Sequence, residues 1–191
     1  MKKLSKKNII LASVVLLLLL IIGGSLAYFG WASAEEEINS SIDVTIVGGT
    51  GVCSKLTDNN KLLVPTSSRE KGRIITIKAV QQVSSYATIT WNMVVNRLNT
   101  TATTTTGLRH ESFKYELINT TTNTSYGSGN FSNINNGETI VFTSNEILEL
   151  NREYTFTLYL WIDGEMGVNP NDMQNQTYDI DMNCTITGVE T

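Results

Sequence analysis

Residues 154–163 read YTFTLYLWID, and residues 177–186 read TYDIDMNCTI. In both stretches apolar side chains alternate with polar ones, and this period of two indicates a half-buried β-strand. Thr, Ile, Tyr and Phe are frequent in them, and these residues suit a pleated surface. The two stretches therefore predict the longest strands of an all-β domain.

Five further stretches, on the N-terminal side of these two, alternate in the same way. They cover residues 42–46, 73–80, 87–98, 112–119 and 139–143. Polar segments rich in Gly, Thr and Asn separate them and are predicted to be loops: residues 48–51, 99–107 and 119–137. Seven or so strands joined by polar loops predict an antiparallel β-sandwich.

The first 34 residues differ in kind from the rest. Residues 9–29 carry no charge, and a helix of about 20 apolar residues spans the hydrocarbon core of a bilayer. Four lysines precede this run and three glutamates follow it, so the positive-inside rule places the C-terminal part outside the cytoplasm. The predicted organisation is a transmembrane segment (1–34), a linker (35–41) and an extracellular domain (42–191).

Two interpretations of the N-terminal segment remain open. A cleaved signal peptide would use the small residues at Ser25-Leu26-Ala27 or Ala32-Ser33-Ala34, with cleavage after Ala27 or Ala34. However, the apolar run is longer than the ~7–15 residues of a signal peptide, which favours an uncleaved anchor. The protein is thus expected either as a single-pass membrane protein or in secreted form.

Residues 23–29, GGSLAYF, resemble the Gly-Gly-Thr-x-Ala-Tyr-Phe export signature of camelysin–TasA-type proteins. Those proteins are secreted surface and biofilm-fibre proteins of Gram-positive bacteria. The resemblance implies cleavage after Ala27 and a β-sandwich destined for the cell surface.

Residues 148–154, LELNREY, are similar to the tyrosine corner of fibronectin type III and immunoglobulin-like domains. In that corner the tyrosine hydroxyl bonds back to the backbone of the preceding turn. Trp91 likewise resembles the core tryptophan of such domains. The resemblance implies an immunoglobulin-like sandwich in which Tyr154 and Trp91 have structural roles.

The chain contains two cysteines, Cys53 and Cys184. Outside the cytoplasm such a pair is expected to oxidise, so we predict an internal disulfide. Closing a loop of about 130 residues would contribute at most about 5 kcal/mol. Two buried free thiols, or an intermolecular bridge, are the alternatives.

Charge excludes one class of partner. The net charge is -4, from 14 Lys and Arg against 18 Asp and Glu, and four of those lysines lie in the N-terminal segment. The outer domain is therefore more acidic than the whole chain. Nucleic-acid binding requires a basic surface, so we expect no nucleic-acid partner.

Catalytic motifs are missing from the sequence, and we expect a protein that is not an enzyme. His110, the single histidine, would have to act alone, whereas Ser or Cys nucleophiles normally need a positioned histidine base. The glycine cluster at 48–51 lacks the Lys-Ser/Thr of a phosphate loop. Asp179 and Asp181 alternate on the outward side of a predicted strand, where solubility explains them.

One loop has the composition of a calcium site. Five oxygen-bearing side chains fall within ten residues: Asp163, Glu165, Asn169, Asn171 and Asp172. Hard oxygen ligands are what Ca²⁺ prefers, but the same residues populate ordinary turns. Calcium is the one cofactor that the sequence raises, and a plain turn is the simpler interpretation.

Export, the sandwich pattern and the missing catalytic motifs together predict a non-enzymatic bacterial protein of the cell surface or the medium, acting in adhesion or in a matrix or fibre. Its expected partners are the membrane, through the N-terminal helix, and further copies or surface molecules. Thr155, Thr157, Tyr159 and Trp161 form one predicted outward row. The alternative is a membrane-tethered module that binds carbohydrate or peptide, with Tyr159 and Trp161 as a stacking platform.

Overall fold

The computed structural model describes Val15 and residues 44–47, 56–59, 65–82, 84–98, 107–166 and 177–189. The chain divides into two compact units, residues 1–37 and 38–191. In the first unit Val15 alone is described, in a helical conformation. Within the described ranges there is no helix with the length and apolar character needed to span a bilayer. The predicted transmembrane segment, apart from Val15, and both candidate cleavage sites lie outside those ranges.

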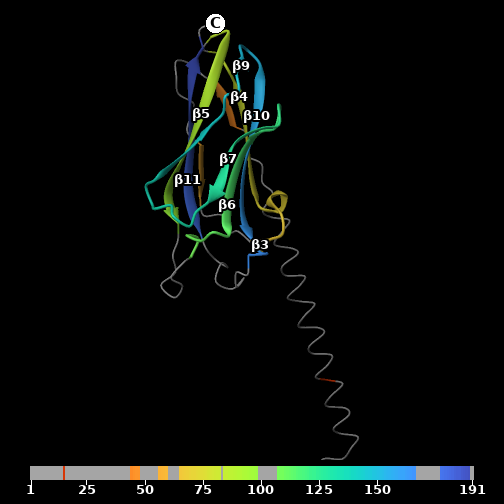
Figure 1. Ribbon diagram of the computed structural model, residues 1–191, viewed down its shortest axis with the longest axis vertical. Coiled ribbons are helices and arrows are strands. Elements are labelled where there is room, and N and C mark those ends of the chain that lie inside the picture. Colours follow the sequence, from red (N-terminus) through yellow and green to blue (C-terminus); the bar gives the residue numbers. More distant parts are fainter. Residues whose placement is uncertain are drawn as a thin grey trace, which may run out of the picture. The chain divides into compact units, whose positions relative to one another are not determined.

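The second unit is all-β in its described part, as predicted, and its strands form two sheets (Figure 1). Sheet A has the order β1-β4-β10-β6-β7, with β3 paired to β10, and sheet B has the order β2-β11-β5-β8, with β9 paired to β5. Sheet A consists of β1 (Val44–Val47), β3 (Pro65–Thr66), β4 (Arg73–Val80), β6 (Phe113–Asn119), β7 (Thr124–Asn130) and β10 (Glu153–Asp163). Sheet B consists of β2 (Leu56–Asn59), β5 (Tyr86–Leu98), β8 (Thr139–Thr143), β9 (Leu148–Glu149) and β11 (Tyr178–Gly188). A short 3-10 helix, η1 (Arg69–Lys71), precedes β4.

The core lies between the two sheets, which pack face to face. Along β4 the side chains alternate strictly between buried and half-buried, as the sequence pattern predicts. Aromatic rings from opposite sheets meet in the core: Trp91 of β5 lies 5.0 Å from Phe156 of β10, between ring centroids. Phe113 of β6 and Tyr178 of β11 are 6.1 Å apart by the same measure. Such pairs contribute about 0.5–1.5 kcal/mol each beyond their buried area.

The predicted tyrosine corner is present. The backbone N–H of Glu149 donates a hydrogen bond to the hydroxyl of Tyr154 at 2.9 Å. Asn151, in the turn between them, has a positive φ of 60°, and its backbone N–H donates to the carbonyl of Gln81 at 2.8 Å. Trp91 is fully buried. The structural roles predicted for Tyr154 and Trp91 are therefore confirmed.

The prediction of a loop over residues 119–137 is wrong, because strand β7 lies within this range. β7 reads TSYGSGN and buries Tyr126 alone, so it shows no apolar alternation from which a strand could be predicted. Backbone pairing with β6 defines it instead. Asn123 turns the chain between β6 and β7 with a φ of 59°.

Two pairings are parallel, which the predicted antiparallel pattern did not include: β1 with β4 and β3 with β10. The connection between β1 and β4 explains the first of them. The chain leaves β1 in sheet A, passes through β2 in sheet B, and re-enters sheet A at β3 before it forms β4. A crossover of this kind allows two neighbouring strands to run in the same direction.

Candidate functional site

The face of sheet A that points away from the core carries the predicted outward row of β10. Thr155, Tyr159 and Trp161 are half-buried and alternate with buried core residues. Thr157 departs from the prediction, because it is only 5% exposed. We call this surface, with the side chains that neighbouring strands add to it, the outer face of sheet A.

Charged residues of β6 flank the two aromatic rings. Glu116 stands opposite Tyr159, and Lys114 stands opposite Trp161. Lys114 Nζ lies 2.7 Å from Asp163 Oδ2 at the end of β10. The outer face therefore combines two aromatic side chains with paired charges.

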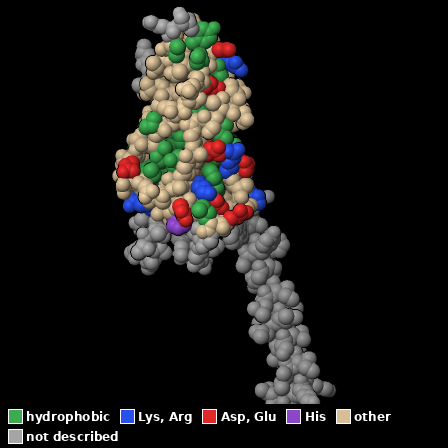
Figure 2. All heavy atoms as spheres, in the orientation of Figure 1, with side chains coloured by type: hydrophobic (Ala, Val, Ile, Leu, Met, Phe, Trp, Pro, Cys, Tyr) green, Lys and Arg blue, Asp and Glu red, His purple; other side chains and the backbone are tan. Residues whose placement is uncertain are grey.

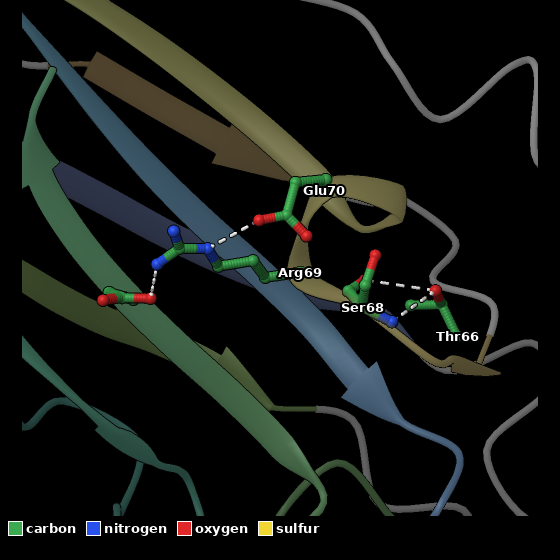
Figure 3. Close-up of polar contacts among 5 residues, drawn as sticks. Thr66, Ser68, Arg69 and Glu70 are labelled. Atoms are coloured by element: carbon green, nitrogen blue, oxygen red, sulfur yellow. Dashed lines mark hydrogen bonds and ion pairs between the residues drawn. The ribbon is translucent and has the colours of Figure 1, made fainter.

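Helix η1 covers part of this face. The guanidinium carbon of Arg69 lies 4.9 Å from the centroid of the Tyr159 ring, a cation–π contact. The same guanidinium forms ion pairs with Glu116 and, at 2.9 Å, with Glu70, as Figure 3 shows. Hydrogen bonding from Arg69 holds the pKa of the Glu70 carboxyl below its usual value. Arg69 thus covers one face of the ring of Tyr159, the residue predicted as part of a stacking platform.

Two local features position η1. The backbone N–H of Ser68 donates to Thr66 Oγ1 at 3.2 Å, and Thr66 Oγ1 donates to the carbonyl of Ser68 at 3.1 Å (Figure 3). At the other end Gly72 packs directly on β10: an added Cβ would lie 2.6 Å from Trp161 Cβ and would collide with the Leu160 carbonyl oxygen. Only a residue without a side chain allows this close approach.

The predicted calcium ligands are only partly described. Asp163 uses one carboxylate oxygen for Lys114 and the other for the backbone N–H of Glu165, at 3.0 Å. Hydrogen bonding from Lys114 lowers the pKa of Asp163. Across the described ranges, no group of three or more His, Cys, Asp or Glu could hold a metal ion. The other three predicted ligands, Asn169, Asn171 and Asp172, lie outside those ranges.

Hydrogen bonds between His110 and Ser112 stabilise the turn that precedes β6. His110 Nδ1 lies 2.9 Å from Ser112 Oγ and accepts the Ser112 backbone N–H at 3.1 Å. Ser112 is fully buried, so its hydroxyl is not open to a substrate. This contact is a local turn interaction of the kind that short polar side chains make with nearby backbone.

The structure corrects the prediction that Asp181 is a solvent-exposed residue. Asp181 lies on the outward side of β11, but it is only 5% exposed. Its carboxylate accepts hydrogen bonds from Thr57 Oγ1 and Asn96 Nδ2, both at 2.6 Å. Asp181 therefore links three neighbouring strands of sheet B, and solubility does not explain it.

Cys184 is fully buried on β11, and no free cysteine occurs in the described part of the chain. Cys53, its predicted partner, lies outside that part. The Cys53–Cys184 pairing stays a prediction.

Sequence reasoning missed two polar clusters. Glu146, in the loop after β8, accepts hydrogen bonds from Asn119 Nδ2 and the Tyr126 hydroxyl, both at 2.8 Å. Asp58 and Arg73 form a buried ion pair between the two sheets. No sequence pattern would have identified these clusters. Glu146 is a single Glu in a loop, and Asp58 and Arg73 are single charged residues on separate strands. The alternation of Lys114 and Glu116 on β6 could have identified the charged part of the outer face.

Comparison with known proteins gives distant likenesses. No family model matches the chain, and no curated protein matches it. The insecticidal delta-endotoxin Cry8Ea1 from Bacillus thuringiensis is similar over 61% of this chain, with 8% identity and a TM-score of 0.28. The match spans only 18% of the toxin chain. The pre-peptidase C-terminal domain of a collagenase from Bacillus anthracis is similar over 78% of this chain and 100% of its own length, with 11% identity and a TM-score of 0.32.

Proposed function

We propose that this chain is a non-enzymatic protein of the bacterial cell surface or the medium, with a role in adhesion or in a matrix or fibre. Its outer unit would be an immunoglobulin- or fibronectin-like sandwich, exported by an N-terminal membrane helix. The tyrosine corner at Tyr154 and the buried Trp91 support the sandwich type. The uncharged residues 9–29 and the export signature at 23–29 support export.

One observation carries the assembly role: the edge position of strand β1 in sheet A. β1 has four residues and, among the strands that the structure describes, it lies at the edge of sheet A and pairs with β4 alone. Its pairing is parallel, which is slightly less stable per residue than antiparallel pairing. An edge strand held by a single neighbour can be replaced by a strand from another chain, and such strand addition joins subunits.

The experiment compares the full chain with a variant whose β1 residues, Val44–Val47, are replaced by Gly and Ser. Both proteins are recovered from the membrane and from the medium, and their assembly state is followed by sedimentation as concentration rises. We expect the native chain to form larger assemblies and the β1 variant to lose them. Strictly monomeric behaviour of the native chain up to millimolar concentration would refute the proposed assembly.

A second candidate function rests on Trp161, which is half-buried on the outer face of sheet A beside the Lys114–Asp163 ion pair. An indole next to paired charges suits stacking and hydrogen bonding with a glycan or a peptide. Tryptophan fluorescence should then respond to cell-wall glycans, and Trp161→Ala should abolish the response. Tyr86→Ala, which changes an exposed aromatic residue of sheet B, is the matched control and should leave the response intact.

A further inference from the structure

Strand β8 lies at an edge of sheet B in the part of the chain that the structure describes. In the described part of the chain it pairs with β5 alone. Its five residues, TIVFT, include no charge and no proline, which are two of the devices that keep edge strands from pairing with other chains. Val141, at its centre, is 57% exposed. Figure 2 shows one face of the molecule, on which hydrophobic side chains gather near the middle of the coloured part with charged side chains beside and below them.

The backbone register shows which groups of β8 face the open side. Val95 donates to the Glu138 carbonyl at 2.9 Å and accepts from the Gly137 N–H at 2.7 Å. Hydrogen-bonded positions alternate along an antiparallel pair, so Ile140 and Phe142, which stand opposite Met93 and Trp91, point their backbone groups toward β5. The backbone N–H and C=O groups of Thr139, Val141 and Thr143 therefore point away from the sheet.

These outward groups belong to a strand that is complementary to itself. When a second TIVFT strand runs antiparallel to the first and is centred on Val141, a threonine stands opposite a threonine at each end. Between the ends, each large apolar residue stands opposite another. From this we infer that β8 is a docking edge for a second copy of this chain, with the two β8 strands antiparallel about a two-fold axis through Val141. The pairing would place Thr139 opposite the partner's Thr143 and Val141 opposite the partner's Val141.

Burial and charge agree with this register. The two Val141 side chains would cover each other, which removes the exposed apolar surface from water. The nearest charged residue, Glu138, would stand opposite the partner's Ser144, so no like charges would face each other. The interface would be isologous, as closed two-fold dimers require. It uses a different edge from β1, and it stands whether or not β1 is exchanged between chains.

The test is thiol cross-linking of the full chain with a short bis-maleimide reagent. Val141→Cys should give a covalent dimer whose linked peptides join residue 141 to residue 141. Thr185→Cys is the matched control, because Thr185 is exposed on β11 in the same sheet but away from the β8 edge. Unchanged protein, which has Cys53 and Cys184, reports the background.

The register has its own test. A mixture of Thr139→Cys and Thr143→Cys chains should cross-link to each other much more than either variant cross-links to itself. Val141→Lys should abolish the dimer, since like charges directly opposite destabilise a strand pair, whereas Thr185→Lys should leave it unchanged.

Equal cross-linking of Val141→Cys and Thr185→Cys, or a dimer that survives Val141→Lys, would overturn the inference. The β1 variant described above separates the two proposals. It should lose the larger assemblies and keep the 141–141 cross-link. Loss of the assemblies with no 141–141 cross-link in either protein would support β1 exchange without β8 pairing.

Discussion

Arg73 and Asp58 form an ion pair that joins the two sheets through the core. Arg73 Nη2 of β4 lies 3.0 Å from Asp58 Oδ1 of β2, and both side chains are 2% exposed. The hydroxyl of Tyr178 donates a hydrogen bond to Asp58 Oδ2 at 2.5 Å. Because each charge is removed from water, each depends on the other for compensation.

Removing one partner of this pair should therefore be costly. We expect Arg73→Met to lower the free energy of unfolding by about 3–5 kcal/mol, because it leaves the Asp58 carboxylate buried without its cation. Urea unfolding measures the change. Lys78→Ala is the control, since Lys78 and Glu153 form an exposed pair at 3.7 Å and such pairs contribute about 0–1 kcal/mol. A loss below 1 kcal/mol for Arg73→Met would contradict the role assigned to the pair.

Alkaline pH should destabilise the protein through Tyr178. Burial and the charge of Asp58 raise the pKa of Tyr178 far above its usual value. A raised folded-state pKa means that the stabilisation is complete below the unfolded value, about 10, and is lost as the pH rises above it. Stability should fall by up to about 1.4 kcal/mol per pH unit above pH 10 on account of this group.

Tyr178→Phe isolates that contribution. The variant should be less stable at neutral pH, because Asp58 loses a donor, but its stability should fall less steeply above pH 10. Tyr126, whose pKa burial also raises, continues to titrate in both proteins. Parallel curves for the two proteins between pH 10 and 11.5, in urea unfolding, would exclude Tyr178 as a source of the decline.

Gly72→Ala should disturb the outer face of sheet A. The added methyl group would meet the Leu160 carbonyl and Trp161 Cβ, and overpacking of this kind costs about 1–3 kcal/mol. The same change should push η1 away from Tyr159 and make that ring more accessible to iodide quenching. Gly164→Ala is the control: its nearest contacts would lie at 3.6 Å, so it should be nearly neutral.

Tyr154→Phe tests the corner. It removes the acceptor of the Glu149 N–H in a partly buried hydrogen bond without changing the volume of the ring, and the loss of such a bond costs about 0.5–1.5 kcal/mol. Thermal unfolding measures the loss. Tyr86→Phe, at an exposed position, should have no measurable effect; equal effects of the two substitutions would show that the corner bond contributes nothing.

Peptide mapping under non-reducing conditions checks the predicted disulfide. We expect one linked peptide that joins Cys53 and Cys184. Its reduction should lower stability by about 2–5 kcal/mol, the range found when a native disulfide is removed from a small secreted domain. Recovery of both cysteines as free thiols from exported protein would contradict the prediction.

Local sequence was enough to predict much of the fold. The alternation at 73–80 and 139–143 predicted β4 and β8 with their observed bounds, and the pattern at 154–163 predicted most of β10. The corner at Tyr154 was predicted from the resemblance of residues 148–154 to a known motif, and its donor and acceptor lie five residues apart. In each case the information is carried by residues that are close together in the chain.

Tertiary structure decided which strands are neighbours and what covers the candidate site. Periodicity shows which side chains of a strand are buried, but it does not show which strand pairs with it, since backbone pairing is nearly independent of side chains. For this reason β7, the parallel β1–β4 pair and the Arg73–Asp58 contact were not predictable. Arg69 is the clearest case: its place over Tyr159 depends on a 3-10 helix, the small size of Gly72 and Glu116, 47 residues away in sequence. Only the packed chain brings these residues together.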